Sequence, residues 1–144
     1  PDFQDYIKSV LSNAKILAET LKNNGFKIYS GGTDTHLMLV DLRPFNVKGN
    51  LAAESLCRAN ITCNKNGIPF DTESPMVTSG IRLGSQAATT RGFGLKEFEM
   101  VGQLITKVIK GLSSNPEDNS KVENEVRQEV IELCSKFPIY KHLG

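Results

Sequence analysis

The chain has 144 residues, the size of one ordinary domain, and can bury a single hydrophobic core without disulfides or metal ions. A hydrophobic fraction of 39% and a charged fraction of 23% are typical of a globular protein and exclude a disordered chain. The formal net charge is +1 and no block of basic residues occurs, so nucleic acid is not expected as a partner.

The first part of the chain predicts two helices and three short strands. Apolar residues at helical spacing over residues 6–21 indicate an amphipathic helix. Residues 26–29 and 36–42 are apolar runs separated by turn-forming glycines, and they predict two strands. A short helix over residues 51–59 and a brief strand over residues 61–64 follow.

An irregular segment divides these elements from the rest. Residues 65–80 contain glycines and prolines that break regular structure, and so long a loop in a compact domain is often functional. Residues 81–83 then predict a strand that ends at Gly84. An amphipathic helix follows, with its apolar face over residues 98–112.

The last helix has a strong start signal. Asn115 precedes Pro116 and two acidic residues, which is typical of an N-cap followed by the first helical turn. Apolar residues at helical spacing continue over residues 122–134, and the helix is expected to end before Pro138. The elements together predict an α+β domain in which a small, mainly antiparallel sheet packs against amphipathic helices.

The cysteine and histidine content points away from disulfides and metals. Cys57, Cys63 and Cys134 are an odd number without C-x-x-C spacing, and each has apolar neighbours, as buried thiols do. We therefore expect a reducing, cytoplasmic location, and no apolar run is long enough to span a membrane. His36 and His142 are far apart in the sequence, and no metal site is predicted.

One arginine stands out. In the segment Ser79-Gly80-Ile81-Arg82-Leu83-Gly84, Arg82 lies between two apolar residues with a glycine beyond each. Glycines let a ligand or a neighbouring backbone approach closely, and the guanidinium forms bidentate pairs with carboxylates. Binding of an amino-acid α-carboxylate is one interpretation of Arg82. An internal structural salt bridge is the other, and the local pattern favours neither.

Four motifs occur in a fixed order along the chain: residues 31–37 (GGTDTHL), 58–66 (RANITCNKN), 78–84 (TSGIRLG) and 91–93 (RGF). In order and spacing they resemble the C-terminal domain of serine hydroxymethyltransferase, a pyridoxal-phosphate enzyme of fold type I. Residues 137–140 (FPIY) are similar to that family's ending. The resemblance implies that residues 1–144 are this small C-terminal domain, without the large domain that holds the cofactor.

The resemblance implies an enzyme that converts serine and tetrahydrofolate to glycine and 5,10-methylenetetrahydrofolate with pyridoxal phosphate, as a homodimer or higher homo-oligomer. In that family the arginine of the S-G-I-R motif binds the substrate carboxylate, a role that falls on Arg82. The second asparagine of the N-K-N motif contacts the folate, which implies this contact for Asn66. Ser74-Pro75-Met76 matches a segment at the folate site. The alternatives are that Asn66 is an ordinary turn residue and that Ser74-Pro75 is a kink.

The chain also departs from the family pattern. Ser85-Gln86 stands where a Thr-Pro pair is usual, and Thr35 replaces the asparagine before His36. No threonine-rich run of the kind that precedes the family's cofactor lysine occurs, so the resemblance implies that no catalytic residue lies in this chain. The chain alone is then expected to be inactive. The alternative function is a module that binds a small carboxylate or folate without chemistry.

Overall fold

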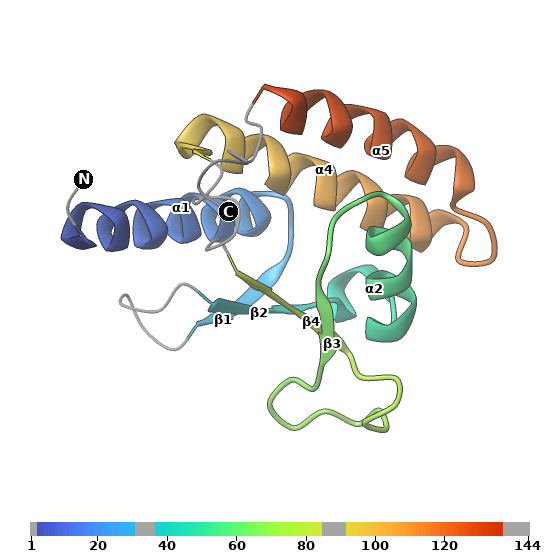
Figure 1. The fold of residues 1–144 in the computed structure, drawn as a ribbon. Helices are drawn as coiled ribbons and strands as arrows, with labels where there is room; N and C mark the ends of the chain where they lie inside the picture. Colours follow the sequence, from blue (N-terminus) through green and yellow to red (C-terminus); the bar gives the residue numbers. More distant parts are fainter. Residues whose placement is uncertain (1–2, 31–36, 85–91, 137–144) are drawn as a thin grey trace.

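This computed structural model describes residues 3–30, 37–84 and 92–136. Within these ranges, helices α1 and α4 cover one face of a four-stranded sheet, and α5 packs against α4 (Figure 1). Helix α2 packs against α4, α5 and the neighbouring strands β3 and β4. The predicted α+β class is confirmed.

The four predicted helices are confirmed, and they differ from the predicted ranges only at their ends. They are α1 Phe3–Asn23, α2 Gly49–Arg58, α4 Leu95–Ser114 and α5 Ser120–Ser135, with a short 3-10 helix η1 Arg43–Phe45. Each α-helix turns most of its apolar residues toward the core and most of its charged residues toward solvent, as the helical spacing predicts, and Glu123 of α5 is a buried exception.

The start of α5 differs from the prediction. Asn115 closes α4 instead of opening α5, because its N–H donates to a carbonyl of the last turn of α4 at 2.9 Å. Helix α5 begins at Ser120, where the Asp118 carboxylate accepts hydrogen bonds from the Ser120 N–H and hydroxyl at 3.1 and 2.7 Å. The prediction of Pro116 at the first helical position was therefore wrong, since Asp118 and Asn119 form the start of α5.

The sheet has the order β1-β2-β4-β3, and every pair in it is antiparallel. Its strands are β1 Lys27–Ser30, β2 Leu37–Asp41, β3 Asn64–Asn66 and β4 Gly80–Gly84. The prediction of a strand over residues 61–64 was wrong except at its last residue. The N–H of Ile61 donates to the Leu56 carbonyl at 2.8 Å and closes the turn after α2, so pairing with β4 begins only at Asn64.

The hydrophobic core lies between the sheet and helices α1 and α4. Val40 and Ile81, opposite each other on β2 and β4, are fully buried, whereas Arg82, the next residue of β4, is exposed. A close approach of the two helices requires Gly102 of α4. A Cβ at Gly102 would lie 2.7 Å from the Thr20 methyl carbon of α1, so a larger residue would force the helices apart.

All three cysteines are free. The expectation that each is buried was wrong for Cys57, which lies on the solvent side of α2, while Cys63 and Cys134 are half-buried. Burial raises the pKa of the Cys63 thiol to about 12. No described helix is long and apolar enough to cross a membrane, and no described cluster of acidic, cysteine and histidine residues could hold a metal ion. His36 and His142 lie outside the described residues.

Candidate functional site

The outer face of the sheet, away from α1 and α4, carries Arg82. In the sheet register, Arg82 on β4 lies opposite Leu39 on β2 and opposite Asn64 on β3. Tyr29 on β1 lies opposite Leu39. Because directly opposite residues of antiparallel strands point to the same face, these four side chains form one row across the sheet.

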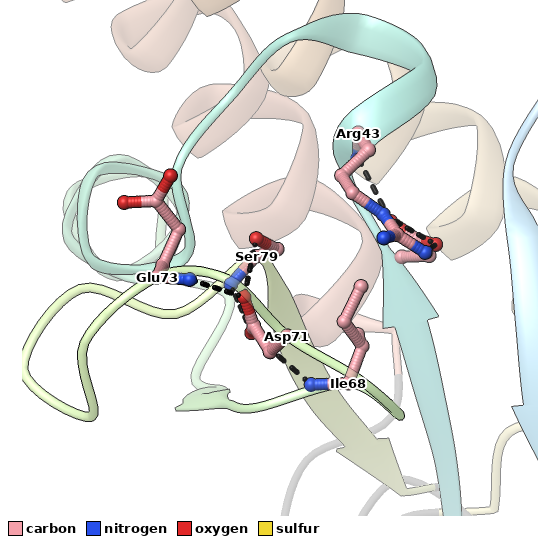
Figure 2. A network of polar contacts seen from close by, with 6 residues as sticks. Arg43, Ile68, Asp71, Glu73 and Ser79 are labelled. Atoms are coloured by element: carbon pink, nitrogen blue, oxygen red, sulfur yellow. Dashed lines mark hydrogen bonds and ion pairs between the residues drawn. The ribbon is translucent and has the colours of Figure 1, made fainter.

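The guanidinium of Arg82 is exposed and unpaired within the described part of the chain. No described carboxylate forms an ion pair with it and no described residue accepts a hydrogen bond from it. By contrast, Arg43 pairs with Asp41 (Figure 2) and Arg58 pairs with Glu123, each through two guanidinium nitrogens. Arg82 therefore has no partner among the described residues with which it could form an internal salt bridge.

Asn66 lies on the same face of the sheet as Arg82. It is opposite Gly80 in the β3–β4 register, two positions along β3 from Asn64, which is opposite Arg82. Its side-chain amide donates to the Gly67 carbonyl at 2.9 Å. Asn66 is a strand residue, so the alternative that it is an ordinary turn residue was wrong. The structure thus brings Arg82 and Asn66 to one face on neighbouring strands.

Gly80 allows this part of the sheet to pack tightly. A Cβ at Gly80 would lie 2.7 Å from the Ile68 side chain and 2.8 and 3.0 Å from the carbonyl oxygens of Val40 and Asn66. Both carbonyls belong to flanking strands and cannot retreat without disturbing the sheet. Of the two uses predicted for glycines beside Arg82, close approach of a neighbouring backbone is confirmed at Gly80.

The loop that joins β3 to β4, residues 67–79, is held together by one carboxylate (Figure 2). Asp71 accepts hydrogen bonds from the N–H groups of Ile68, Glu73 and Ser79 at 3.2, 2.9 and 2.8 Å, and from the Ser79 hydroxyl at 2.8 Å. Burial alone would raise the pKa of Asp71, but these hydrogen bonds outweigh it and lower the pKa to about 2. Asp71 therefore fixes the start of the loop to its end.

The predicted folate segment, residues 74–76, lies on this loop with its side chains exposed. The N–H groups of the two residues that follow donate to the Ser74 carbonyl at 3.0 and 2.9 Å, which closes a turn and fits the alternative of a kink. No hydrogen bond between described residues joins the segment to Arg82 or Asn66. The segment belongs to the loop that directly links their two strands.

Sequence reasoning did not single out Asp71. An aspartate in a glycine- and proline-rich loop often accepts local backbone hydrogen bonds, and this was the signal that could have found it. The motif residues 31–36 and 91, the segment 137–140, and the departures at Thr35, Ser85 and Gln86 lie outside the described residues.

Replacement of Asp71 by alanine is expected to loosen the loop, because four donors lose their acceptor at a cost of about 1–3 kcal/mol. The pKa of about 2 lies below the ordinary 3.8, so the stabilisation is present above about pH 4 and is lost as the pH falls toward 2. Amide hydrogen exchange at Ile68, Glu73 and Ser79 measures the effect, with Asp5→Ala on α1 as the control. Unchanged protection of these amides in Asp71→Ala would contradict the assignment.

The environment of each described lysine decides whether that lysine can anchor pyridoxal phosphate as a Schiff base. All of the described lysines are exposed to solvent. A lysine that forms a Schiff base is usually activated by desolvation in an apolar pocket or by a neighbouring cation. None of the described lysines has a desolvated environment, so the described residues do not fit an anchor for pyridoxal phosphate.

The fold and its outer face define an α+β domain that presents on its sheet an exposed arginine with no partner among the described residues. The family model described as serine hydroxymethyltransferase matches residues 1–105. The chain therefore belongs to the serine hydroxymethyltransferase family.

Individual relatives agree with this assignment. The chain is 85% identical over 143 residues, 99% of its length, to a serine hydroxymethyltransferase of Pelagibacter ubique (strain HTCC1062). It is 63% identical over 141 residues, 98% of its length, to one of Marinomonas sp. (strain MWYL1). It is 64% identical over 140 residues, 97% of its length, to serine hydroxymethyltransferase 3 of Colwellia psychrerythraea. The chain covers 33%, 33% and 32% of these relatives, so it spans about a third of their length.

Proposed function

We propose that this chain is the C-terminal, substrate-binding part of an enzyme that interconverts serine and glycine, with tetrahydrofolate as co-substrate and pyridoxal phosphate as cofactor. The observation that carries the proposal is the exposed guanidinium of Arg82, which has no partner among the described residues. Family membership supplies the reaction to which this arginine is suited.

Arg82 binds the α-carboxylate of the amino-acid substrate through two parallel hydrogen bonds. Because its position in the middle of β4 is fixed by pairing on both sides, the carboxylate is held in one orientation relative to the sheet. Asn66 on the same face, and residues 74–76 on the adjoining loop, contribute to the binding of folate. The chain thus orients both substrates.

The remaining two-thirds of the polypeptide supplies the lysine and holds most of the cofactor. Pyridoxal phosphate, when bound there, supplies the electron sink for the reaction. The whole protein is a homodimer or higher homo-oligomer, and the free thiols of this chain suit the reducing cytoplasm.

The 144-residue chain alone is expected neither to incorporate pyridoxal phosphate covalently nor to form glycine from serine. Borohydride reduction in the presence of the cofactor, followed by mass spectrometry, measures covalent incorporation. The full-length protein, treated in parallel, is expected to trap one cofactor per polypeptide. One stoichiometrically modified lysine in the short chain would contradict the proposal that the cofactor lysine lies in the remaining two-thirds of the polypeptide. A full-length protein that binds folate but forms no glycine would favour the binding module.

A further inference from the structure

The loop of residues 67–79 carries two exposed apolar side chains. Phe70 is 97% exposed, the highest value among the large hydrophobic residues of the described chain, and Met76 is 73% exposed. Figure 1 shows that this loop projects from β3 and β4 on the side away from α4 and α5. An aromatic ring that is left in water forgoes the stabilisation that burial gives, so a fully exposed phenylalanine is available for a contact outside the described residues.

The backbone holds Phe70 in this exposed position. Its φ angle is 57°, in the left-handed region that a bulky residue rarely adopts. On one side, Ile68 is buried at 5% exposure, and on the other, Asp71 ties the loop together with four hydrogen bonds (Figure 2). The neighbours of Phe70 are therefore fixed, which keeps the ring directed away from the domain core. A rigid aromatic side chain is the usual anchor of an interface, because little conformational entropy is lost when it docks.

The position of the loop indicates what covers Phe70. The loop begins directly after Asn66 and ends directly before the strand that carries Arg82. This inference takes the proposed function as its basis. In that function, the outer face of the sheet, which carries Arg82 and Asn66, meets the part of the protein that holds the cofactor. The curated relatives are about three times as long as this chain, so most of the polypeptide is available to make the contact.

We infer that Phe70 docks into an apolar pocket on the remaining two-thirds of the same polypeptide. The loop is then the interface between the two parts of the protein. Asp71 sets its shape and Phe70 is its anchor. The contact places Arg82 and Asn66 against the part of the protein that holds the cofactor.

The test uses the full-length protein and the substitution Phe70→Asn. Asparagine adopts the left-handed conformation more readily than phenylalanine, so the loop keeps its shape and only the ring is lost. Amide hydrogen exchange over residues 67–79 is expected to become about tenfold faster, with a lower thermal midpoint. Phe70→Tyr is expected to preserve protection. The control Ile131→Gln removes an exposed apolar side chain from α5 and is expected to change neither quantity.

Three results would overturn the inference. They are equal protection in Phe70→Asn and wild type, an equal effect of Ile131→Gln, and loss of protection accompanied by a lower oligomeric mass, which would show that a second copy covers Phe70. Failure of the proposed function is measured separately, because it appears as full glycine formation by Arg82→Ala, whatever the exchange of this loop.

Discussion

In the full-length protein, Arg82→Ala is expected to reduce catalytic efficiency with serine by roughly tens- to thousands-fold, and Arg82→Lys is expected not to restore it. The fold-change corresponds to about 2–5 kcal/mol of lost transition-state binding. The reason is geometric, because a guanidinium offers a carboxylate two parallel donors and an ammonium is a single point charge. Steady-state kinetics on the three proteins measures this effect.

The thermal midpoint separates binding from structure. Arg82 is exposed and has no ion-pair partner among the described residues, so Arg82→Ala is expected to leave the midpoint nearly unchanged. Lys65→Ala is the matched control, since Lys65 is an exposed cation on the neighbouring strand β3, opposite Ile81. If Arg82→Ala melts far lower while its folded fraction keeps near-normal efficiency, Arg82 is a structural residue.

Glu123→Ala is expected to cause the largest loss of stability, about 2–4 kcal/mol. Glu123 is 5% exposed, and its carboxylate accepts hydrogen bonds from Arg58 at 2.8 and 2.9 Å and from the Ser55 hydroxyl. The Asn119 amide donates to Ser55 and to the Val108 carbonyl, both at 3.0 Å. This network joins α2, α4 and α5, so its loss leaves buried polar groups unpaired at the meeting point of three helices.

The dependence on pH gives the same prediction a second test. The hydrogen bonds from Arg58 hold the pKa of Glu123 below its ordinary value, although burial opposes them. The stabilisation is therefore complete above the unfolded pKa of about 4.3 and declines as the pH falls through the folded pKa. Urea unfolding at pH 7 and pH 3 measures this, and the deficit of Glu123→Ala is expected to shrink at the lower pH.

The control for Glu123 lies on the same helix. Glu125 is 48% exposed and pairs with Lys107 at the surface, so Glu125→Ala is expected to cost no more than about 1 kcal/mol. Two results would contradict the prediction: equal losses of unfolding free energy in the two variants, or a loss in Glu123→Ala that does not change with pH. Either would show that the buried network stabilises the fold no more than a surface ion pair does.

The sequence predicted most of the fold because its elements carry long, regular apolar patterns. Strand β3 was misplaced because Asn64-Lys65-Asn66 is short and polar, and its strand conformation comes only from pairing with β4. The start of α5 was misplaced because Asn115 and Pro116 form a good local start signal, while the closing hydrogen bond of α4 and the cap at Asp118 decide the boundary. In both cases tertiary context overrides local preference.

The candidate site was predictable in part. The glycines around Arg82 and the resemblance of its motif marked this residue, but the absence of a described ion-pair partner depends on where distant acidic residues lie. That Asn66 shares a face with Arg82 depends on the register of β3 against β4, which a single sequence does not reveal. The exposure of Phe70 follows from a backbone conformation that phenylalanine rarely adopts, so no composition pattern could indicate it.

The packing of α1 on α4 has a consequence for synthesis on the ribosome. Asn13 of α1 donates its side-chain hydrogen bond to the carbonyl of Phe93, 80 residues later in the chain. Leu17 and Leu21, buried in the finished domain, have no helix to pack against until α4 has left the exit tunnel. At roughly 5–20 residues per second, the nascent chain displays this apolar surface for on the order of several seconds, long enough for a chaperone to bind α1 before the domain folds.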